Sequence, residues 1–290
     1  MKIAALRWQD RERIGVVDAA GEAIAVKDLD PDVVWRQRDA VRIDLVEKAA
    51  TLAEVSVRDA TLLPPVPRPA KLLCIAANYY DHIKESGRVE NVEVVRPQFF
   101  MKPPGTCLIG HRATFRIPAN AGFLDYEAEL AVVIGKRLYQ AADLDEALAA
   151  VAGYAAFNDI SERNMSFDPR EDKRSNMPFF DWLTGKWLDG SAPMGPWVTT
   201  ADEIPDPQAL SIELRLNGKV MQSASTALMM SPVADIVWYG SQFMTLEPGD
   251  VIATGTPAGV GKPQGIRLKP GDTTEVTIDK IGTLVTYFGA

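Results

Sequence analysis

The chain has 290 residues, 47% of them hydrophobic and 24% charged, which is ordinary for a globular protein with an ample core. A net charge of −8 and no run of Lys or Arg argue against nucleic acid as a partner, because a nucleic-acid interface needs a basic patch. The N-terminal residues do not form a signal-peptide pattern, and no stretch reaches the roughly 18 apolar residues of a membrane span. We therefore expect a cytoplasmic protein without a membrane partner.

The first 65 residues resemble a small separate unit of the α/β type. Strand-like runs at residues 1–8 and 13–26 precede residues 38–55, where apolar side chains recur at helical spacing. Residues 61–71 contain four prolines and cannot continue a helix or a central strand, so they predict a linker. The expected organisation is an N-terminal domain over residues 1–65 and a main domain over residues 66–290.

Strand-like runs dominate the main domain. They occupy residues 71–77, 98–102, 129–135, 153–159, 197–200, 210–220, 250–256, 272–279 and 282–288. Helical spacing is confined to a few segments such as 143–151 and 231–244, and Asn217-Gly218 between alternating residues predicts a β-hairpin. Strands in succession without regular helix alternation indicate an α+β fold that is mostly β, with antiparallel strands and helices at the edges.

Acidic residues mark the start of one buried strand. In an extended chain Asp125, Glu127 and Glu129 share one face, and residues 131–134 that follow are apolar on both faces. Crowded carboxylates repel one another, so they either face water or surround a cation, and the spacing leaves both interpretations open. Asp159 ends another strand-like run, where Asp is often a turn former. Joined to the glutamates, it completes an all-oxygen set that suits Mg²⁺ or Mn²⁺ better than zinc.

Other candidate groups are weaker when taken alone. His82 and Glu85 lie three residues apart on a short predicted helix, where the carboxylate could prepare the imidazole as a general base or form a surface ion pair. Lys186 lies among turn formers and could be solvated. Residues 250–261 predict a strand that runs into a Gly-rich turn, whose backbone N–H groups can bind a carboxylate. Pro263 after the Gly-Lys pair argues against a P-loop.

The segments 78–87, 98–110, 124–136, 153–164, 185–197, 216–222 and 249–261, taken in order, resemble the fumarylacetoacetate hydrolase superfamily. The likeness is to its bacterial branch that includes 2-hydroxyhepta-2,4-diene-1,7-dioate isomerases, and it covers roughly residues 68–288. It implies a mixed β-sandwich roll with a small N-terminal appendage, a homodimer, and bound Mg²⁺ or Mn²⁺.

The resemblance also implies roles for individual residues. Metal ligands would be Glu127, Glu129 and Asp159, and catalytic residues His82, Glu85 and Lys186. Substrate-binding residues would be Arg163, Thr256, Lys102 and Ser166. Ser166 replaces an amide side chain that many members carry, and the connection to Lys186 is long. We therefore expect residues 164–185 to carry substrate specificity.

The leading hypothesis is metal-dependent hydrolysis of a C–C bond in a 2,4-dioxo acid, either an acylpyruvate or a diketo-deoxy sugar acid. The metal would stabilise an enolate, His82 poised by Glu85 would activate water, and Lys186 would stabilise oxyanion charge. The same site could serve an oxaloacetate decarboxylase, a 2-hydroxydienoate isomerase or tautomerase, or a 2-keto-3-deoxy acid dehydratase. A non-catalytic metal-binding protein is the alternative from another class.

Overall fold

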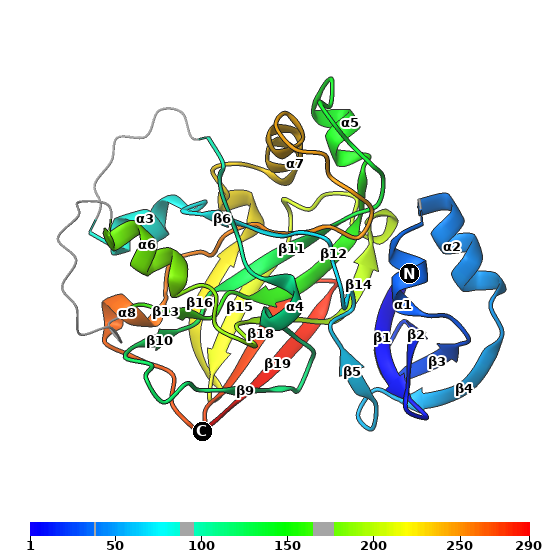
Figure 1. The fold of residues 1–290 in the computed structure, drawn as a ribbon, viewed down its shortest axis with the longest axis horizontal. Coiled ribbons are helices and arrows are strands. Elements are labelled where there is room, and N and C mark those ends of the chain that lie inside the picture. Colours follow the sequence, from blue (N-terminus) through cyan, green and yellow to red (C-terminus); the bar gives the residue numbers. More distant parts are fainter. Residues whose placement is uncertain (38, 88–95, 165–176) are drawn as a thin grey trace.

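The structure of the protein is a computed structural model that describes residues 1–37, 39–87, 96–164 and 177–290. Within these ranges the strands form a 12-stranded sheet, a 5-stranded sheet and a 2-stranded ribbon, with helices at the periphery (Figure 1). Most strand pairs are antiparallel, and the parallel pairs are β14–β8, β17–β6 and β19–β9. The expected α+β class with mostly β structure is confirmed.

The N-terminal elements form one end of the large sheet. They are β1 (Lys2–Trp8), β2 (Arg11–Val17), β3 (Ala23–Lys27), α1 (Pro31–Trp35), α2 (Asp39–Lys48), β4 (Thr51–Ser56) and β5 (Thr61–Leu63). The helix expected over residues 38–55 ends at Lys48, because the residues after it form β4 and pair with β3. The predicted linker begins as a strand, since β5 pairs with β1. The domain boundary at residue 65 stays a prediction, and β1 joins the main sheet through β14.

The centre of the large sheet is apolar on both faces. It contains β6 (Leu72–Ala76), β11 (Ala128–Ile134), β12 (Val151–Asn158), β14 (Ala192–Thr200) and β17 (Val251–Ala253). Beyond β6, β7 (Gln98–Met101) forms the edge of the sheet, and β8 (Leu108–Ile109) pairs with β14. Every residue of β11, β12 and β14 is buried. Alternate residues of β11 enter different cores, Leu130 and Val132 one and Ala131 and Val133 the other. A strand covered on both sides has no polar face, which explains the continuous apolar runs in the sequence.

The smaller sheet packs against one face of the large sheet. It consists of β15 (Ser211–Leu216), β16 (Lys219–Ser225), β18 (Thr273–Ile278), β19 (Gly282–Gly289) and β9 (Thr114–Arg116). Leu214, Val276 and Leu284 share a core cluster with Leu130 of the large sheet, so the two sheets form a sandwich. The predicted hairpin is confirmed: Asn217 and Gly218 have φ angles of 51° and 79°, the left-handed conformations that this tight turn requires.

The helices fall into two groups. α5 (Leu144–Leu148) and α7 (Val233–Ser241) pack together, and they correspond to the predicted helical segments with shorter bounds. In Figure 1, α3 (Tyr80–Glu85), α6 (Met177–Thr184) and α8 (Gly261–Gln264) gather at the end of the molecule opposite β1–β4. The remaining short elements are α4 (Pro104–Cys107), β10 (Leu124–Asp125), β13 (Ser161–Glu162), η1 (Ala201–Glu203) and η2 (Thr226–Leu228). In the described part of the chain, no helix has the length and apolar character needed to cross a membrane.

Candidate active site

Three carboxylates meet where β11 begins and β12 ends. Glu127 directly precedes β11 and Glu129 lies within it, while Asp159 directly follows β12. The antiparallel register pairs Glu129 with Phe157, so the chain reaches Asp159 beside the two glutamates. Glu127, Glu129 and Asp159 each offer an oxygen within 4.8 Å of the others, and they are only 4%, 1% and 0% exposed. The structure therefore brings together the three predicted metal ligands in a buried cluster, which we call the carboxylate triad.

Two lysines neutralise part of the triad. Lys186 Nζ donates to Glu127 Oε2 at 2.8 Å and to Asp159 Oδ2 at 2.7 Å. Lys102 Nζ donates to Asp159 Oδ1 at 2.5 Å and to the carbonyl oxygen of Ile160 at 3.1 Å. Burial acts to lower the pKa of Lys186, but the charges of Asp159 and Glu127 outweigh it and raise the pKa above its usual value. Lys186 is therefore a charged ammonium held inside the triad.

Two aromatic rings lie near the ammonium of Lys186, whose side chain is only 3% exposed. Its ammonium lies 5.4 Å from the centre of the Phe100 ring and 5.9 Å from that of Trp182, which belongs to α6. The two rings contact each other edge to face at 5.0 Å. Such rings favour a cation through their π faces without offering it a hydrogen-bond acceptor. Two of the three ammonium protons are used on the triad, and the described residues accept no hydrogen bond from the third.

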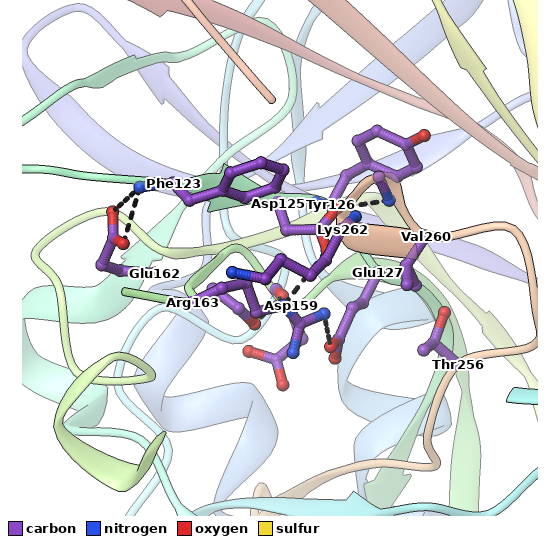
Figure 2. A network of polar contacts seen from close by, with 12 residues as sticks. Phe123, Asp125, Tyr126, Glu127, Asp159, Glu162, Arg163, Thr256, Val260 and Lys262 are labelled. Atoms are coloured by element: carbon purple, nitrogen blue, oxygen red, sulfur yellow. Dashed lines mark hydrogen bonds and ion pairs between the residues drawn. The ribbon is translucent and has the colours of Figure 1, made fainter. Parts of the chain in front are cut away.

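An arginine and a further carboxylate extend this network. Arg163 Nε donates to Asp125 Oδ2 at 3.1 Å, and its Nη2 forms a short hydrogen bond with Glu127 Oε1 (Figure 2). Asp125 also accepts from the backbone N–H of Gly261 at 2.6 Å and of Lys262 at 3.1 Å. The sequence placed Asp125 on the face of the two glutamates but gave it no role. The hydrogen bonds of Asp125 to Gly261 and Lys262 fix its carboxylate, which in turn holds Arg163 next to Glu127.

Glu129 is the one member of the triad without a cationic hydrogen-bond partner among the described residues. Its Oε2 accepts from the backbone N–H of Gly255 at 2.8 Å. Burial, reinforced by the charges of Asp159 and Glu127, raises the pKa of Glu129 well above its usual value. At Glu127 burial also acts upward, but the charges of Lys186 and Arg163 lower its pKa below the usual value. A divalent cation would supply the positive charge that Glu129 lacks, so this all-oxygen set fits Mg²⁺ or Mn²⁺.

The predicted histidine–glutamate pair is formed, and it is bound to the Gly-rich turn after β17. His82 Nδ1 is 2.8 Å from Glu85 Oε1, and both side chains are 18% exposed. Glu85 Oε2 accepts from the backbone N–H of Gly259 at 2.8 Å, which fixes the carboxylate. With Nδ1–H donating to Glu85, the lone pair of His82 is on Nε2. The same turn donates from Gly255 to Glu129, so it connects the pair to the triad.

The remaining predicted residues have different surroundings. Thr256 is buried, and its hydroxyl accepts a hydrogen bond from Gln222 at 2.8 Å, a residue to which sequence reasoning gave no role. Lys102 and Arg163 contact carboxylates of the protein, as described above. Ser166 lies outside the described residues. His111 accepts from the backbone N–H of Val285 at 3.2 Å, which agrees with a structural role.

Comparison with known proteins identifies relatives along nearly the whole chain. The model of the fumarylacetoacetate (FAA) hydrolase C-terminal family matches residues 71–288. A 2,4-didehydro-3-deoxy-L-rhamnonate hydrolase of Sphingomonas sp. (strain SKA58) is 36% identical over 288 residues, 98% of this chain and 94% of the relative. The mitochondrial oxaloacetate tautomerase FAHD2A of Bos taurus is 38% identical over 258 residues, 87% of this chain and 78% of the relative.

A solved structure extends the likeness to the fold. The 2-hydroxyhepta-2,4-diene-1,7-dioate isomerase from Mycobacterium marinum superposes with a TM-score of 0.77 at 28% identity, covering 100% of this chain and 98% of that chain. The relatives thus carry the names of a hydrolase, a tautomerase and an isomerase. On the family match and these relatives, this chain belongs to the fumarylacetoacetate hydrolase family.

Proposed function

We propose that the protein is a divalent-cation-dependent hydrolase that cleaves the bond between C3 and C4 of a 2,4-dioxo acid. One observation carries the proposal: the turn after β17 holds both the buried carboxylate triad, with Lys186 inside it, and the hydrogen-bonded His82–Glu85 pair, through Gly255 and Gly259. The name of the hydrolase relative supports it, because a 2,4-didehydro-3-deoxy acid has oxo groups at C2 and C4 on either side of a methylene. The C–C bond next to such a carbonyl breaks when its electrons can enter an enolate.

In the proposed reaction, the imidazole of His82 takes a proton from water through Nε2. The resulting hydroxide adds to the C4 carbonyl, and the C3–C4 bond then breaks. Its electron pair forms the enolate of a 2-oxo acid, and the former acyl group leaves as a carboxylic acid. The proton held by His82 is returned to C3. One water is consumed, and for an acylpyruvate the products are a carboxylate and pyruvate.

Other residues of the site hold these reacting groups in place. Glu85 keeps the His82 ring oriented and stabilises its protonated form, because its second oxygen is fixed by Gly259. Lys186 offers its remaining N–H to the oxyanion that develops during addition. Glu127, Glu129 and Asp159 would hold Mg²⁺ or Mn²⁺, which supplies Lewis-acid stabilisation for an enolate when bound.

A second candidate function is tautomerisation of oxaloacetate. It is favoured by a relative of that name that is 38% identical over 87% of this chain. This reaction moves a proton between C3 and the oxygen on C2 and needs neither water nor C–C cleavage. His82 would take the proton from C3 and give it to that oxygen. The same triad and histidine serve both reactions, and the two differ in their products.

Product analysis separates the two functions. Purified protein is incubated with Mg²⁺ or Mn²⁺ and a panel of acylpyruvates, a 2,4-diketo-3-deoxy sugar acid, and oxaloacetate. The hydrolase gives stoichiometric pyruvate and carboxylate from a dioxo acid, and His82→Asn abolishes it. Accelerated loss of the enol form of oxaloacetate, with every dioxo acid left intact, would establish the tautomerase instead. Equal rates of conversion of every compound by wild type, by wild type in EDTA and by His82→Asn would exclude catalysis at this site.

We also propose that the active form is a homodimer with a small 2-oxo acid as its ligand. The supporting argument is the family membership of the chain. Analytical ultracentrifugation across a range of protein concentrations measures the mass of the particle. A sedimentation mass that equals one chain at all concentrations would contradict the dimer.

A further inference from the structure

The carboxamide of Gln222, in β16, joins three segments around the carboxylate triad. The side chain is 1% exposed. Its Oε1 accepts from the backbone N–H of Ala128 at 2.9 Å, and Ala128 lies between Glu127 and Glu129. Its Nε2 donates to the carbonyl oxygen of Pro257 at 2.7 Å and to Thr256 Oγ1 at 2.8 Å. Gln222, in β16, therefore contacts both the first residue of β11 and the turn that follows β17.

The backbone partners fix which way this amide points. The N–H of Ala128 can only donate, so the side-chain atom facing it must be the oxygen. The carbonyl of Pro257 can only accept, so the atom facing it must be the nitrogen. Both requirements give the same orientation, and a flipped amide would leave two buried backbone groups unpaired. The group that faces Thr256 is therefore an N–H donor.

This orientation determines the direction of the Thr256 hydroxyl. A hydroxyl has one hydrogen to donate, and towards Gln222 the Thr256 oxygen must accept. Its own hydrogen is left to point elsewhere. Within residues 1–37, 39–87, 96–164 and 177–290, no hydrogen bond in which Thr256 donates is formed, although the side chain is only 3% exposed. A buried donor without an acceptor is costly, so the site is incomplete until a ligand supplies one.

The neighbours of Thr256 place this donor beside the triad. The preceding residue, Gly255, donates its backbone N–H to Glu129. Figure 2 shows Thr256 on the same side of the network as Glu127, on the turn that also carries Val260. We propose that Gln222 is a positioning residue that turns the Thr256 hydroxyl into a fixed donor for a carboxylate or oxo oxygen of the bound 2-oxo acid. This inference rests on the proposed function and names the chemical group that the position accepts.

The consequence is selectivity for an acceptor over a donor. An ionised carboxylate oxygen at this position gains a charge-assisted hydrogen bond, whereas an alcohol must spend one of its lone pairs and still place its own hydrogen. Gln222 Nε2 donates both to the Thr256 hydroxyl and to the carbonyl oxygen of Pro257. Without Gln222 the hydroxyl would be free to rotate, and the Pro257 carbonyl would compete with the substrate for its hydrogen. The substrate oxygen would then lose its donor even though Thr256 is still present.

The test combines two substitutions. Gln222→Glu keeps an oxygen for the Ala128 N–H but removes the donor that faces Thr256, so the hydroxyl turns towards the carboxylate. Thr256→Val removes the hydroxyl and preserves the shape of the side chain.

The Kd of oxalate in the presence of Mg²⁺ is measured by calorimetry. KM and kcat are measured with the dioxo acid that the wild type turns over best. Each single variant should raise Kd and KM about tenfold to a hundredfold with a smaller change in kcat. The double variant should bind no more weakly than Thr256→Val alone.

Gln208 provides a matched control. It also accepts from a backbone N–H, that of Val233, and donates to a backbone carbonyl, that of Thr226, but it has no contact with the triad. Gln208→Glu should change thermal stability without changing the Kd of oxalate. Where Gln222→Glu does not fold, Gln222→Met is examined in its place, with and without Thr256→Val.

The outcomes are distinct. A loss of affinity that persists unchanged in the Thr256→Val background means that Gln222 does not act through the hydroxyl, and it overturns the inference. So does an unaltered Kd in Gln222→Glu. Failure of the proposed function looks different, because wild type then neither binds oxalate with Mg²⁺ nor turns over any dioxo acid.

Discussion

Ion pairs at the active-site end of the molecule are buried, whereas those of the N-terminal strands lie at the surface. The side chains of Lys186 and Asp159 are 3% and 1% exposed, while that of Arg68, which pairs with Glu12 and Asp32, is 48% exposed. Charges removed from water are stable only as complete sets, and loss of one partner leaves the other uncompensated. Exposed pairs contribute little because water solvates either charge alone. The difference predicts where single substitutions have large effects.

The largest effect is expected from Lys186→Met. It leaves Glu127 and Asp159 buried without the ammonium between them, and we expect a loss of about 3–5 kcal/mol in the free energy of unfolding of the metal-free protein. Saturating Mg²⁺ should restore part of it, since a cation at the triad replaces the lost charge. Urea unfolding with and without Mg²⁺ measures both. Lys48→Met breaks an exposed pair with Asp44 and serves as the control. Equal losses in the two variants would refute the distinction.

The next effect concerns Glu129, the triad member without a cationic partner among the described residues. Glu129→Gln keeps an acceptor for the Gly255 N–H but removes a carboxylate from the triad. Metal affinity should therefore fall by at least about 100-fold, which exceeds the usual effect of mutating a residue that only hydrogen-bonds to a metal ligand. Stability of the metal-free protein should not fall, because a buried like charge is relieved. Calorimetric titration with Mn²⁺ and thermal unfolding in EDTA give the two quantities. A marked destabilisation in EDTA would show that Glu129 is compensated in some other way.

His111 is a partly buried histidine that extends the comparison to pH, and none of the groups that shift its pKa is an opposite charge. Burial, aided by Arg112, lowers the pKa of His111 to about 4, whereas in the unfolded chain it is about 6.5. Between these values the unfolded chain binds more protons, so the contribution to stability is complete above pH 6.5 and is lost as the pH falls towards 4. We expect about 2 kcal/mol from this residue, allowing for its partial exposure.

His111→Asn tests this expectation, because the Asn oxygen can accept from Val285 without titrating. Wild type should lose more stability than the variant between pH 7 and pH 4.5 in urea unfolding. His82→Asn, which removes the other histidine, controls for loss of an imidazole. Parallel pH profiles for wild type and His111→Asn would rule out this source of acid sensitivity.

The smallest effect is expected from Arg68→Ala. The guanidinium donates to Glu12 at 2.7 Å and to Asp32 at 2.6 Å, but all three groups are partly in water. The loss in stability should be under about 1 kcal/mol, should shrink further in 1 M salt, and should leave kcat unchanged. Thermal unfolding at two salt concentrations checks this. A loss comparable to that of Lys186→Met would mean that exposure does not separate the two regions.

The sequence predicted those parts of the site that depend on local periodicity. Alternation put Glu127 and Glu129 on one face, and helical spacing put His82 near Glu85, since both pairs are close in sequence. Asp125, which the same alternation placed with the glutamates, lies in the separate strand β10 and binds Arg163 instead of joining the triad. Asp159 was joined to the glutamates as a possible third oxygen ligand, and the ordered resemblance supported this, but the pairing of β11 with β12 that brings it there is not visible in either strand alone.

Sequence patterns could not predict contacts between residues far apart in the chain, nor which of two competing local preferences would prevail. The amide of Gln222 meets Ala128 94 positions away, and no spacing rule relates them. Likewise Asp125 meets the backbone of Gly261 across 136 positions. The helical periodicity of residues 38–55 failed after Lys48, because edge pairing with β3 outweighs the propensity of a short segment.

The Gly-rich turn after β17 has one more consequence. Its backbone amides at Gly255, Gly259 and Gly261 bind the carboxylates of Glu129, Glu85 and Asp125. At Gly259 φ is +106°, and a side chain would meet the carbonyl oxygen of Met221 at 2.2 Å. Three carboxylates that come from different elements are thus fixed by one short stretch of main chain. A displacement of this turn would move Glu129, Glu85 and Asp125 together, so a substitution within it acts on all three groups at once.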